Sequence, residues 1–414
     1  MPPPALALLL AALVSAPRTT PGAAPGAPPP EAPAVAPDTS RARLSFSPTF
    51  APLTLYSPSY GFGVEGGLTV RNAVRPGSEV IVGARVSQFL QRADVVVLTA
   101  DPHAEPVFGA LALSAEATTR RRYYGTGPLA PAAARHNLAY TALTADARAG
   151  YYPLGHSGLL LQPGVRLTWD RLRRADEDAP GARDLLGDAS RAALDEALGQ
   201  TRAGVSLGLD VSSDRLDRRL YPRRGSAGRL EARRFYALDG SGLRFNRAVA
   251  QGTGFLPLGR LVLVGEATAA LTRADGDAPL PFAYLPTLDD RIVPAYPTDR
   301  LAGRDVVALG LGGRYPLFAL PGLAGLDAYA MAYFGNAYTD VFAEFSPAVS
   351  LRAPAGGASG RAPLRPSLAL GGQVVNLARE AVIVGGVIGL SPEGFQLVAL
   401  ELTYDLRAPR LYAR

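Results

Sequence analysis

Few residues of this chain could carry out nucleophilic or acid–base chemistry. The 414 residues include three histidines and no cysteine, so no thiolate is present to act as a nucleophile or metal ligand. His103 and His156 fall in short predicted turns, and His136 falls at the start of a predicted strand. A hydrolase needs a base oriented toward its nucleophile, and the adjacent turn residues His156 and Ser157 do not give that geometry. We therefore expect no enzyme activity and no metal site.

Glycines and arginines are the other residue types that could bind a ligand. The short segment Gly125-Thr126-Gly127 lacks the lysine and the strand–turn–helix setting of a phosphate-binding loop, so we expect no cofactor. All 42 basic residues are arginines, and the sequence pI is about 9.6. They are spread along the chain rather than gathered in a basic run, so we expect no nucleic-acid partner.

Many arginines share one face of the predicted strands with carboxylates. The set comprises Arg148, Arg166, Arg202, Arg229, Arg233, Arg244 and Arg365, with Asp146, Asp170, Asp210, Glu231 and Glu401. One interpretation is a solvated lining whose charges are neutralised by cross-strand ion pairs. The other is an anion site, which would need cations that carboxylates do not compensate. The paired lining is the simpler interpretation.

The first 41 residues differ in composition from the rest of the chain. Residues 1–16 hold an apolar run that is too short to span a bilayer as a helix and is followed by small residues. This pattern is typical of a secretory signal peptide, and cleavage could lie as late as residue 24. Residues 17–41 are rich in Pro and Ala, which predicts an extended linker.

From residue 42 onward the hydrophobic pattern has a period of two. In the segment from Leu159 to Trp169 the apolar side chains occupy odd positions, and polar ones lie on the even side. Such strands could face the core of a soluble sandwich or the lipid around a barrel. The signal-like start, strands of about ten residues and a charged second face favour the barrel. No helical run is long enough to span, which leaves a closed barrel as the spanning structure.

The strand pattern predicts an all-β fold, a transmembrane antiparallel β-barrel of about 16 strands over residues 42–406, with 407–414 as a C-terminal tail. Candidate strands begin near Leu44, Tyr60, Ser78, Ala93, Pro106, Leu138, Leu159, Arg202, Ser226, Gly242, Arg260, Asp305, Gly325, Leu364, Ala381 and Gln396. Because single-chain bacterial barrels have even strand numbers, we assign the further apolar run from Val341 to Leu351 to a loop. Long and short connections between consecutive strands then alternate. The sixth connection at the end that carries the long loops precedes Asp305.

The segment from Asp214 to Ser226 reads DRLDRRLYPRRGS and predicts a tight turn. Pro222 fixes φ, Gly225 relieves the bend, and Asp214 can accept hydrogen bonds from its neighbours. Together with Arg215, these residues resemble the Asp-x-Arg, Pro-x-x-Gly signature of the outer-membrane assembly-factor superfamily, which includes BamA, TamA, the bacterial surface antigens and two-partner-secretion transporters. Other matching segments follow the family order: Tyr123–Gly127, Arg314–Leu317, Gly371–Arg379 and Ser391–Phe395. The resemblance covers roughly Leu44 to Leu406 and implies a barrel-only member without periplasmic polypeptide-transport (POTRA) repeats.

The resemblance also implies that the sixth external loop folds into the lumen. In the family, an Arg-Gly-aromatic motif of this loop reaches an acidic residue of a Phe-x-Asp element in the wall. Here Pro294 and Ala295 occupy the Arg and Gly positions, Tyr296 keeps the aromatic, and Asn336 replaces the acid. A buried charge without its partner is costly. The loss of the loop arginine together with the loss of the wall acid avoids this cost. We expect neutral hydrogen bonds, or Arg291 in a shifted register, to hold the loop. The candidate latch residues are Arg291, Pro294, Tyr296, Arg314 and Asn336.

The family resemblance implies a location in the bacterial outer membrane, in contact with its lipids and lipopolysaccharide. It implies assistance to outer-membrane protein assembly or polypeptide translocation, with unfolded outer-membrane or secreted polypeptides as clients and a separate periplasmic module as partner. The alternative is a passive pore or a structural anchor barrel that has lost the transport latch. The altered motif favours this alternative, whereas the resemblance favours assembly or transport.

Overall fold

A computed structural model describes residues 44–49, 53–57, 61–102, 105–128, 130–154, 158–175, 182–217, 221–276, 280–288, 292–320, 324–350, 361–376 and 381–402. The chain divides into two compact units, residues 1–41 and 42–414, and every described residue belongs to the second. The predicted signal peptide, linker and C-terminal tail lie outside the described residues. So do Arg291, His103 and His156.

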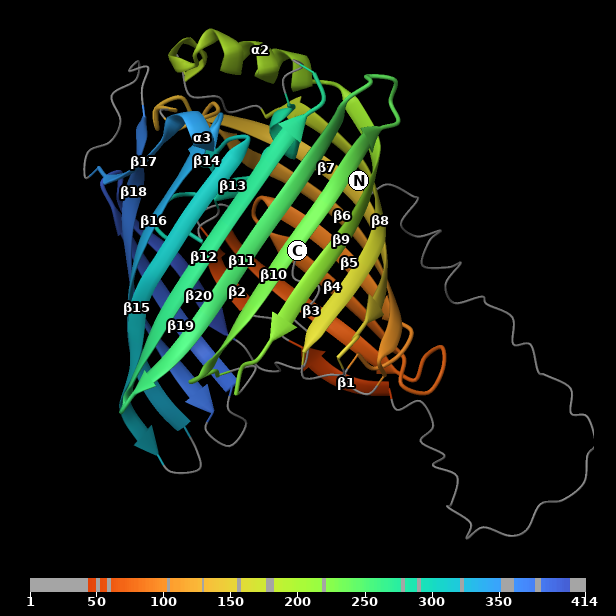
Figure 1. Ribbon diagram of the computed structural model, residues 1–414, viewed down its shortest axis with the longest axis vertical. Helices are drawn as coiled ribbons and strands as arrows, with labels where there is room; N and C mark the ends of the chain where they lie inside the picture. Colours follow the sequence, from red (N-terminus) through yellow and green to blue (C-terminus); the bar gives the residue numbers. More distant parts are fainter. Residues whose placement is uncertain are drawn as a thin grey trace, which may run out of the picture. The chain divides into compact units, whose positions relative to one another are not determined.

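Consecutive antiparallel strands form the wall of the molecule (Figure 1). The first strand is in two pieces, β1 (Leu44–Thr49) and β2 (Leu53–Ser57), which both pair with β3 (Gly61–Arg71). The other wall strands are β4 (Glu79–Ser87), β5 (Leu90–Leu98), β6 (Val107–Tyr123), β7 (His136–Tyr151), β8 (Leu159–Arg174), β9 (Thr201–Asp214), β10 (Gly225–Ala237), β11 (Arg244–Leu258), β12 (Leu261–Ala274), β15 (Asp305–Leu320), β16 (Ala324–Tyr338), β18 (Ala362–Asn376), β19 (Ala381–Ser391) and β20 (Gly394–Leu402). Each pairs with the next, and β2 also pairs with β20.

The strand count agrees with the sequence. The main sheet has eighteen strands, but β1 and β2 are pieces of one strand, and β17 (Phe345–Val349) is a short parallel addition at the start of β18. The wall therefore has about sixteen strands, as predicted. The run from Val341 to Leu351 does not supply a wall strand in its described part, where it forms the single-turn helix α3 (Val341–Glu344) and then β17.

Burial shows which face of the wall points outward. The side chains of Leu207 and Leu209 are 50% and 44% exposed, whereas Asp170 and Asp210 on the other face are only 3% and 2% exposed. A soluble sandwich would bury the leucines and expose the aspartates. The inverted pattern is that of a barrel whose apolar face meets lipid. No helix in the described part of the chain is long and apolar enough to cross a membrane.

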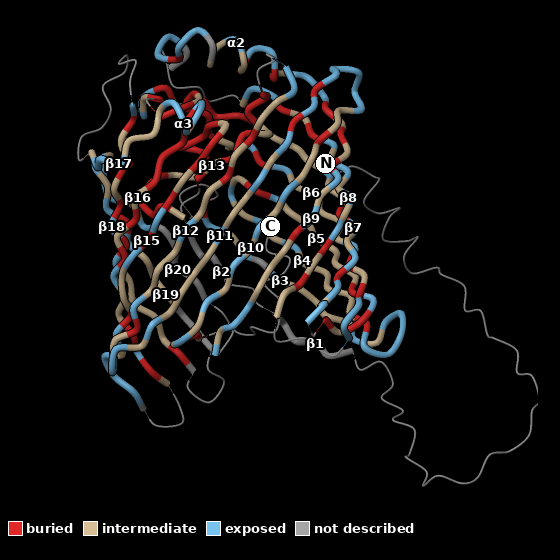
Figure 2. Tube along the Cα trace, viewed as in Figure 1, coloured by how far each residue is buried: buried red, intermediate tan, exposed pale blue. Residues whose placement is uncertain are grey.

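The long connections lie at one end of the barrel. Between β8 and β9 the chain forms a 3-10 turn η1 (Ala182–Leu185) and the helix α2 (Asp188–Ala197), and Figure 1 shows α2 and α3 at the same end. The opposite end carries short turns such as Gly259–Arg260 between β11 and β12. Buried residues concentrate in the half of the barrel nearer α2 and α3 (Figure 2).

The sixth external loop, between β12 and β15, fills this half from inside. It contains a 3-10 turn η2 (Phe282–Tyr284) and the short strands β13 (Thr287–Leu288) and β14 (Leu301–Ala302). Its apolar residues join two buried clusters with inward-facing strand residues: Phe282 belongs to one cluster with Tyr123 and Phe235, and Val293 belongs to the other with Tyr333. The prediction that this loop folds into the lumen is confirmed, and the loop supplies much of the barrel's apolar core.

Candidate functional site

A buried ion pair anchors the sixth loop to the last hairpin. Arg300, in the loop, is 1% exposed. Its Nε donates to Glu393 Oε2 over 2.8 Å and its Nη2 donates to Oε1 over 2.6 Å. Glu393 lies in the turn between β19 and β20, and Arg365 of β18 donates to the same carboxylate over 2.9 Å. This two-pronged contact is the strong form of an arginine–carboxylate interaction.

The expectation that neutral hydrogen bonds hold the loop is incomplete, because the loop also carries this ion pair. The alternative, Arg291, lies outside the described residues and stays a prediction. The anchoring cation is Arg300, four residues beyond Tyr296, and a second pair joins Asp299 to Arg121 of β6 over 3.3 Å. Two signals in the sequence could have found this pair. Asp299 and Arg300 are the charged residues of the stretch 292–302, and Glu393 stands within the matching segment Ser391–Phe395.

Pro294, Ala295 and Tyr296 make close neutral contacts with the wall. The hydroxyl of Ser367 donates to the Pro294 carbonyl oxygen, and the Tyr296 hydroxyl donates to the Pro366 carbonyl oxygen over 3.3 Å. Ala295 has a φ of +77°, and its backbone lies so near Gly389 that a Cβ there would come within 2.4 Å of the Ala295 nitrogen. Burial raises the pKa of Tyr296 to about 12, so its hydroxyl is protonated at neutral pH.

Asn336 serves the wall rather than the loop. Its Nδ2 donates to the Pro363 carbonyl oxygen over 2.8 Å, and its Oδ1 accepts from the Ala337 nitrogen over 2.9 Å. The loop instead packs on the neighbouring Gly335, where an added Cβ would come within 2.8 Å of Val293. The structure therefore does not bring Asn336 and Tyr296 together as a latch pair.

Tyr284 ties the loop to the opposite wall. Its hydroxyl donates to Asp170 of β8 over 2.7 Å, and its carbonyl oxygen accepts from Arg247 of β11. Burial, reinforced by Asp170, raises the pKa of Tyr284. The nitrogen of Gly127 donates to the Ala302 carbonyl oxygen over 2.9 Å, so the matching segment Tyr123–Gly127 also holds the loop.

The turn from Asp214 to Ser226 is held by its own backbone. The Arg215 nitrogen donates to the Ser226 carbonyl oxygen over 2.9 Å, and Asp214 Oδ1 accepts from the Leu216 nitrogen over 3.1 Å. Gly225 has a φ of +107°, and a Cβ there would lie 2.1 Å from the Arg215 carbonyl oxygen. Glycine is therefore required at this position.

This turn also meets Arg314 of β15, beyond β11 and β12 in the sheet. The Arg314 guanidinium lies 3.9 Å from the Tyr221 ring centroid and donates to the Pro222 carbonyl oxygen. The Tyr221 hydroxyl donates to Asp327 of β16 over 2.5 Å, and Gln373 of β18 donates to the same carboxylate over 3.2 Å. Burial, followed by the bond to Asp327, raises the pKa of Tyr221 to about 12.

We call Tyr221, Arg314, Asp327 and Gln373 the turn clamp. The clamp joins the β9–β10 turn to β15, β16 and β18, although β11 and β12 stand between them in the sheet. It brings together two segments that the sequence analysis singled out for separate reasons. Sequence reasoning missed Tyr221 and Asp327, whose meeting depends on the curvature of the wall.

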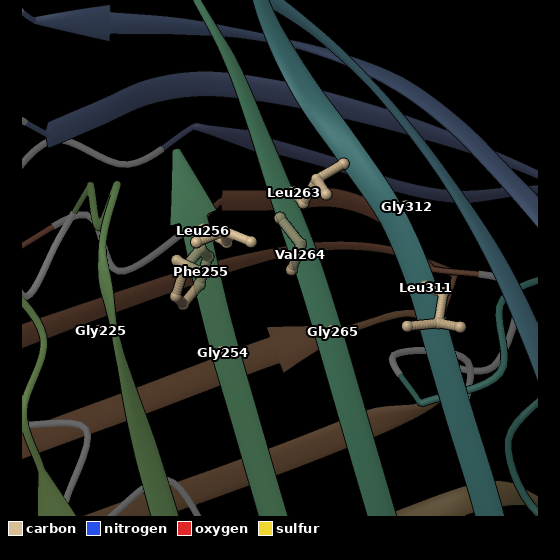
Figure 3. Close-up of a pocket in the computed structure, with 9 residues that line it drawn as sticks. All are labelled: Gly225, Gly254, Phe255, Leu256, Leu263, Val264, Gly265, Leu311 and Gly312. Atoms are coloured by element: carbon tan, nitrogen blue, oxygen red, sulfur yellow. The ribbon is translucent and has the colours of Figure 1, made fainter. Parts of the chain in front are cut away.

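A shallow depression of about 660 Å³ lies on the wall between β10 and β15 (Figure 3). Its leucines, Leu256, Leu263 and Leu311, are exposed on the outer face of the barrel. The remaining lining residues are Gly225, Gly254, Phe255, Val264, Gly265 and Gly312. The lining holds no ionisable side chain, so we assign it no chemistry. The described residues also contain no group of three or more side chains suited to hold a metal ion.

Comparison with known proteins gives matches among solved structures. BamA from Haemophilus ducreyi lacking POTRA domains 1–3 superposes with a TM-score of 0.53 and 13% identity, over 84% of this chain and 68% of that chain. The chain has the fold of a BamA-like outer-membrane β-barrel. CdiB from Escherichia coli superposes with a TM-score of 0.50 and 12% identity, over 84% of this chain and 58% of that chain. No family model and no curated protein sequence matches.

This fold, with its apolar outer face, fits the bacterial outer membrane that the sequence predicted. This chain spans little more than half of the CdiB chain and about two thirds of the BamA chain. What those proteins do therefore enters only as a proposal.

Proposed function

We propose that this BamA-like barrel assists outer-membrane protein assembly or polypeptide translocation by opening between its first and last strands. The observation that carries the proposal is the seam. Within the described residues the β2–β20 ladder consists of Leu53↔Leu402, Thr54↔Glu401 and Tyr56↔Leu400, with a register shift between the last two pairs. The β15–β16 ladder, in contrast, runs from Asp305↔Tyr338 to Leu320↔Ala324.

A short ladder lowers the cost of opening. Each backbone hydrogen bond contributes about 1 kcal/mol net, so separating the described parts of β2 and β20 costs less than separating β15 from β16. The freed strand edges would offer unpaired donors and acceptors to an incoming strand. An unfolded outer-membrane or secreted polypeptide is a client of this kind.

The loop anchor acts on one side of this seam. Glu393 lies in the turn of the β19–β20 hairpin, and β20 is the seam strand. Arg300 therefore fixes the sixth loop to the hairpin that must move when the seam opens. Release of this pair would couple movement of the loop to opening of the wall.

A disulfide across the seam tests the proposal. The chain has no cysteine, and residues directly opposite in antiparallel strands lie within disulfide reach. The measurement is the rate at which an unfolded barrel client folds into liposomes. We expect the oxidised double variant Thr54→Cys/Glu401→Cys not to accelerate this folding, and we expect reduction of the disulfide to restore the acceleration. The matched control is Ala232→Cys/Ala248→Cys, a directly opposed pair in the long β10–β11 ladder, for which oxidation should change nothing. Full client folding by the oxidised seam variant would rule out lateral opening.

A second candidate is a passive pore or a structural anchor barrel that has lost the transport latch. It is favoured by Pro294 and Ala295 in the loop and Asn336 in the wall, which stand where the family's latch would be. Conductance in a planar bilayer separates the candidates: a steady open level supports the pore, and client folding supports assembly. The absence of both would indicate an anchor or adhesive surface. Neither candidate includes an enzymatic step, and a separate periplasmic module is a partner only of the first.

A further inference from the structure

A dense group of charges lines the inner wall over β7 to β11. Asp146 accepts from Arg148 and Arg166, both over 2.8 Å, and Asp210 accepts from Arg229 over 2.7 Å and from Arg148 over 3.2 Å. Glu231 accepts from Arg229 and Arg233. We call this group, together with Arg247, the lumenal arginine cluster. Its five guanidinium groups exceed its three carboxylates by two positive charges.

Two arginines of the cluster face each other on neighbouring strands, although Arg233 also donates to Glu231 and lies 3.6 Å from Asp146. Arg233 of β10 is directly opposite Arg247 of β11 in the antiparallel register, and like charges in such positions repel. The strand pattern in the sequence predicted Arg244 on the lumenal face. The structure instead leaves Arg244 exposed at the start of β11 and directs Arg247 to the loop carbonyl of Tyr284. This three-residue shift moves a cation into the cluster.

The wall is shaped to accommodate these side chains. A Cβ on Gly208 of β9 would lie 2.5 Å from Arg233 Cγ, and one on Gly164 of β8 would lie 2.9 Å from Arg148 Cγ. The two glycines therefore let both arginines lie against the sheet. The Arg233 side chain is 8% exposed.

Arg233 and Arg247 each have an N–H donor that makes no hydrogen bond within the protein. Arg233 Nη1 and Arg247 Nε are both buried without a protein acceptor. A buried donor without an acceptor is destabilising. Solvent can still reach the cluster through Arg166 and Arg229, whose side chains are 29% and 26% exposed.

We propose that Arg233 and Arg247, with Arg166 beside them, bind an oxyanion of the phosphate class in the lumen. A tetrahedral oxyanion supplies acceptors to the unused donors and offsets the excess positive charge, and the planar arginine fork matches its oxygens. The site lies on β8, β10 and β11, far around the wall from the β2–β20 seam. It therefore does not depend on the proposed lateral opening.

The test is ligand-dependent stabilisation of the purified full chain in detergent. Folded and unfolded barrel are separated by gel mobility after heating, while sodium phosphate is titrated against chloride at constant ionic strength. Ligand that binds only the folded state raises the unfolding temperature. We expect phosphate to do so for the native chain, and we expect Arg233→Gln and Arg247→Gln each to weaken phosphate binding about tenfold.

Arg92→Gln is the matched control. Arg92 faces the lumen from β5 and is paired with Asp94 over 2.8 Å, so its loss should leave the phosphate effect unchanged. Glycerol 3-phosphate shows which kind of phosphate the site binds. If it raises the unfolding temperature as inorganic phosphate does, the ligand is a phosphate-ester headgroup. If only inorganic phosphate raises it, the ligand is the free ion. The proposal is overturned if phosphate does not shift the native chain, or if both glutamine variants respond as the native chain does.

Discussion

At the scale of single residues, Arg300 is the side chain on which the position of the sixth loop depends most. Its guanidinium is buried and bound at two points by Glu393, which also binds Arg365. Removing one member of a buried ion pair leaves the partner's charge less compensated. The neutral contacts of Pro294 and Tyr296 with Ser367 and Pro366 lie beside Arg365 on β18 and carry no charge, so they cannot replace the ion pair.

We predict that Arg300→Gln destabilises the folded barrel by about 3 kcal/mol, at the low end for a buried pair because Glu393 retains Arg365. Urea unfolding in detergent measures this, and limited proteolysis should show faster cutting between β12 and β15. The control is Arg71→Gln, because the Arg71 side chain is half exposed in its pair with Glu79; its cost should stay below about 1 kcal/mol. Equal costs for the two variants would contradict the anchoring role of Arg300.

Tyr221 carries a second prediction, which concerns pH. Its pKa is raised to about 12 from about 10 in an unfolded chain, because burial and Asp327 favour the protonated hydroxyl. The stabilisation is therefore complete below pH about 10 and is lost as the pH rises through about 12. Tyr221→Phe keeps the ring under Arg314 but removes the hydrogen bond, at a cost of about 1–2 kcal/mol. The stability difference between native chain and variant should shrink between these pH values; a constant difference would show that the Tyr221 hydroxyl does not titrate in the clamp.

At the scale of elements, small residues decide where the loop can rest on the wall. Gly389 of β19 receives the Ala295 backbone and Gly335 of β16 receives Val293. These contacts are between backbone or branched side chains, which have little room to move. The absence of a side chain at Gly389 and at Gly335 therefore leaves the space that the loop occupies at these two points.

Gly389→Ala should displace the loop, since its Cβ would lie 2.4 Å from the Ala295 nitrogen. We expect overpacking to cost about 1–3 kcal/mol and proteolysis of the loop to accelerate. Gly254→Ala is the control, because an added Cβ there meets no atom within 4 Å, and it should behave as the native chain. If the loop of the Gly389→Ala variant were protected as in the native chain, this contact would not position it.

At the scale of the whole molecule, the barrel is occupied rather than empty. The sixth loop fills the half nearer α2, and the turn clamp joins the β9–β10 turn to β15, β16 and β18. Polar side chains that would be solvated in an open pore are instead bound to these two insertions, as Asp170 is to Tyr284 and Asp327 to Tyr221. Opening of the seam would therefore require these insertions to move or to act as part of the mechanism.

The family resemblance implied which loop enters the lumen, whereas the pattern of the chain itself predicted the class of fold and the strand number. These follow from local information: a period of two sets which face is apolar, and turn residues set where strands end. The even strand number of such barrels, rather than the local pattern, placed Val341 to Leu351 outside the wall strands. The local pattern also predicted a charged inner face, because alternation along each strand fixes the face of most side chains.

Only the tertiary structure decided which charges meet. Arg300 and Glu393 are 93 residues apart, and Tyr221 meets Asp327 across strands that the sheet keeps separate. Arg247 rather than Arg244 belongs to the lumenal arginine cluster, because residues three apart in one strand lie on opposite faces and β11 directs Arg247 inward. Such pairings depend on how the wall curves and where the loop settles, so the sequence could supply the charged residues but not their partners.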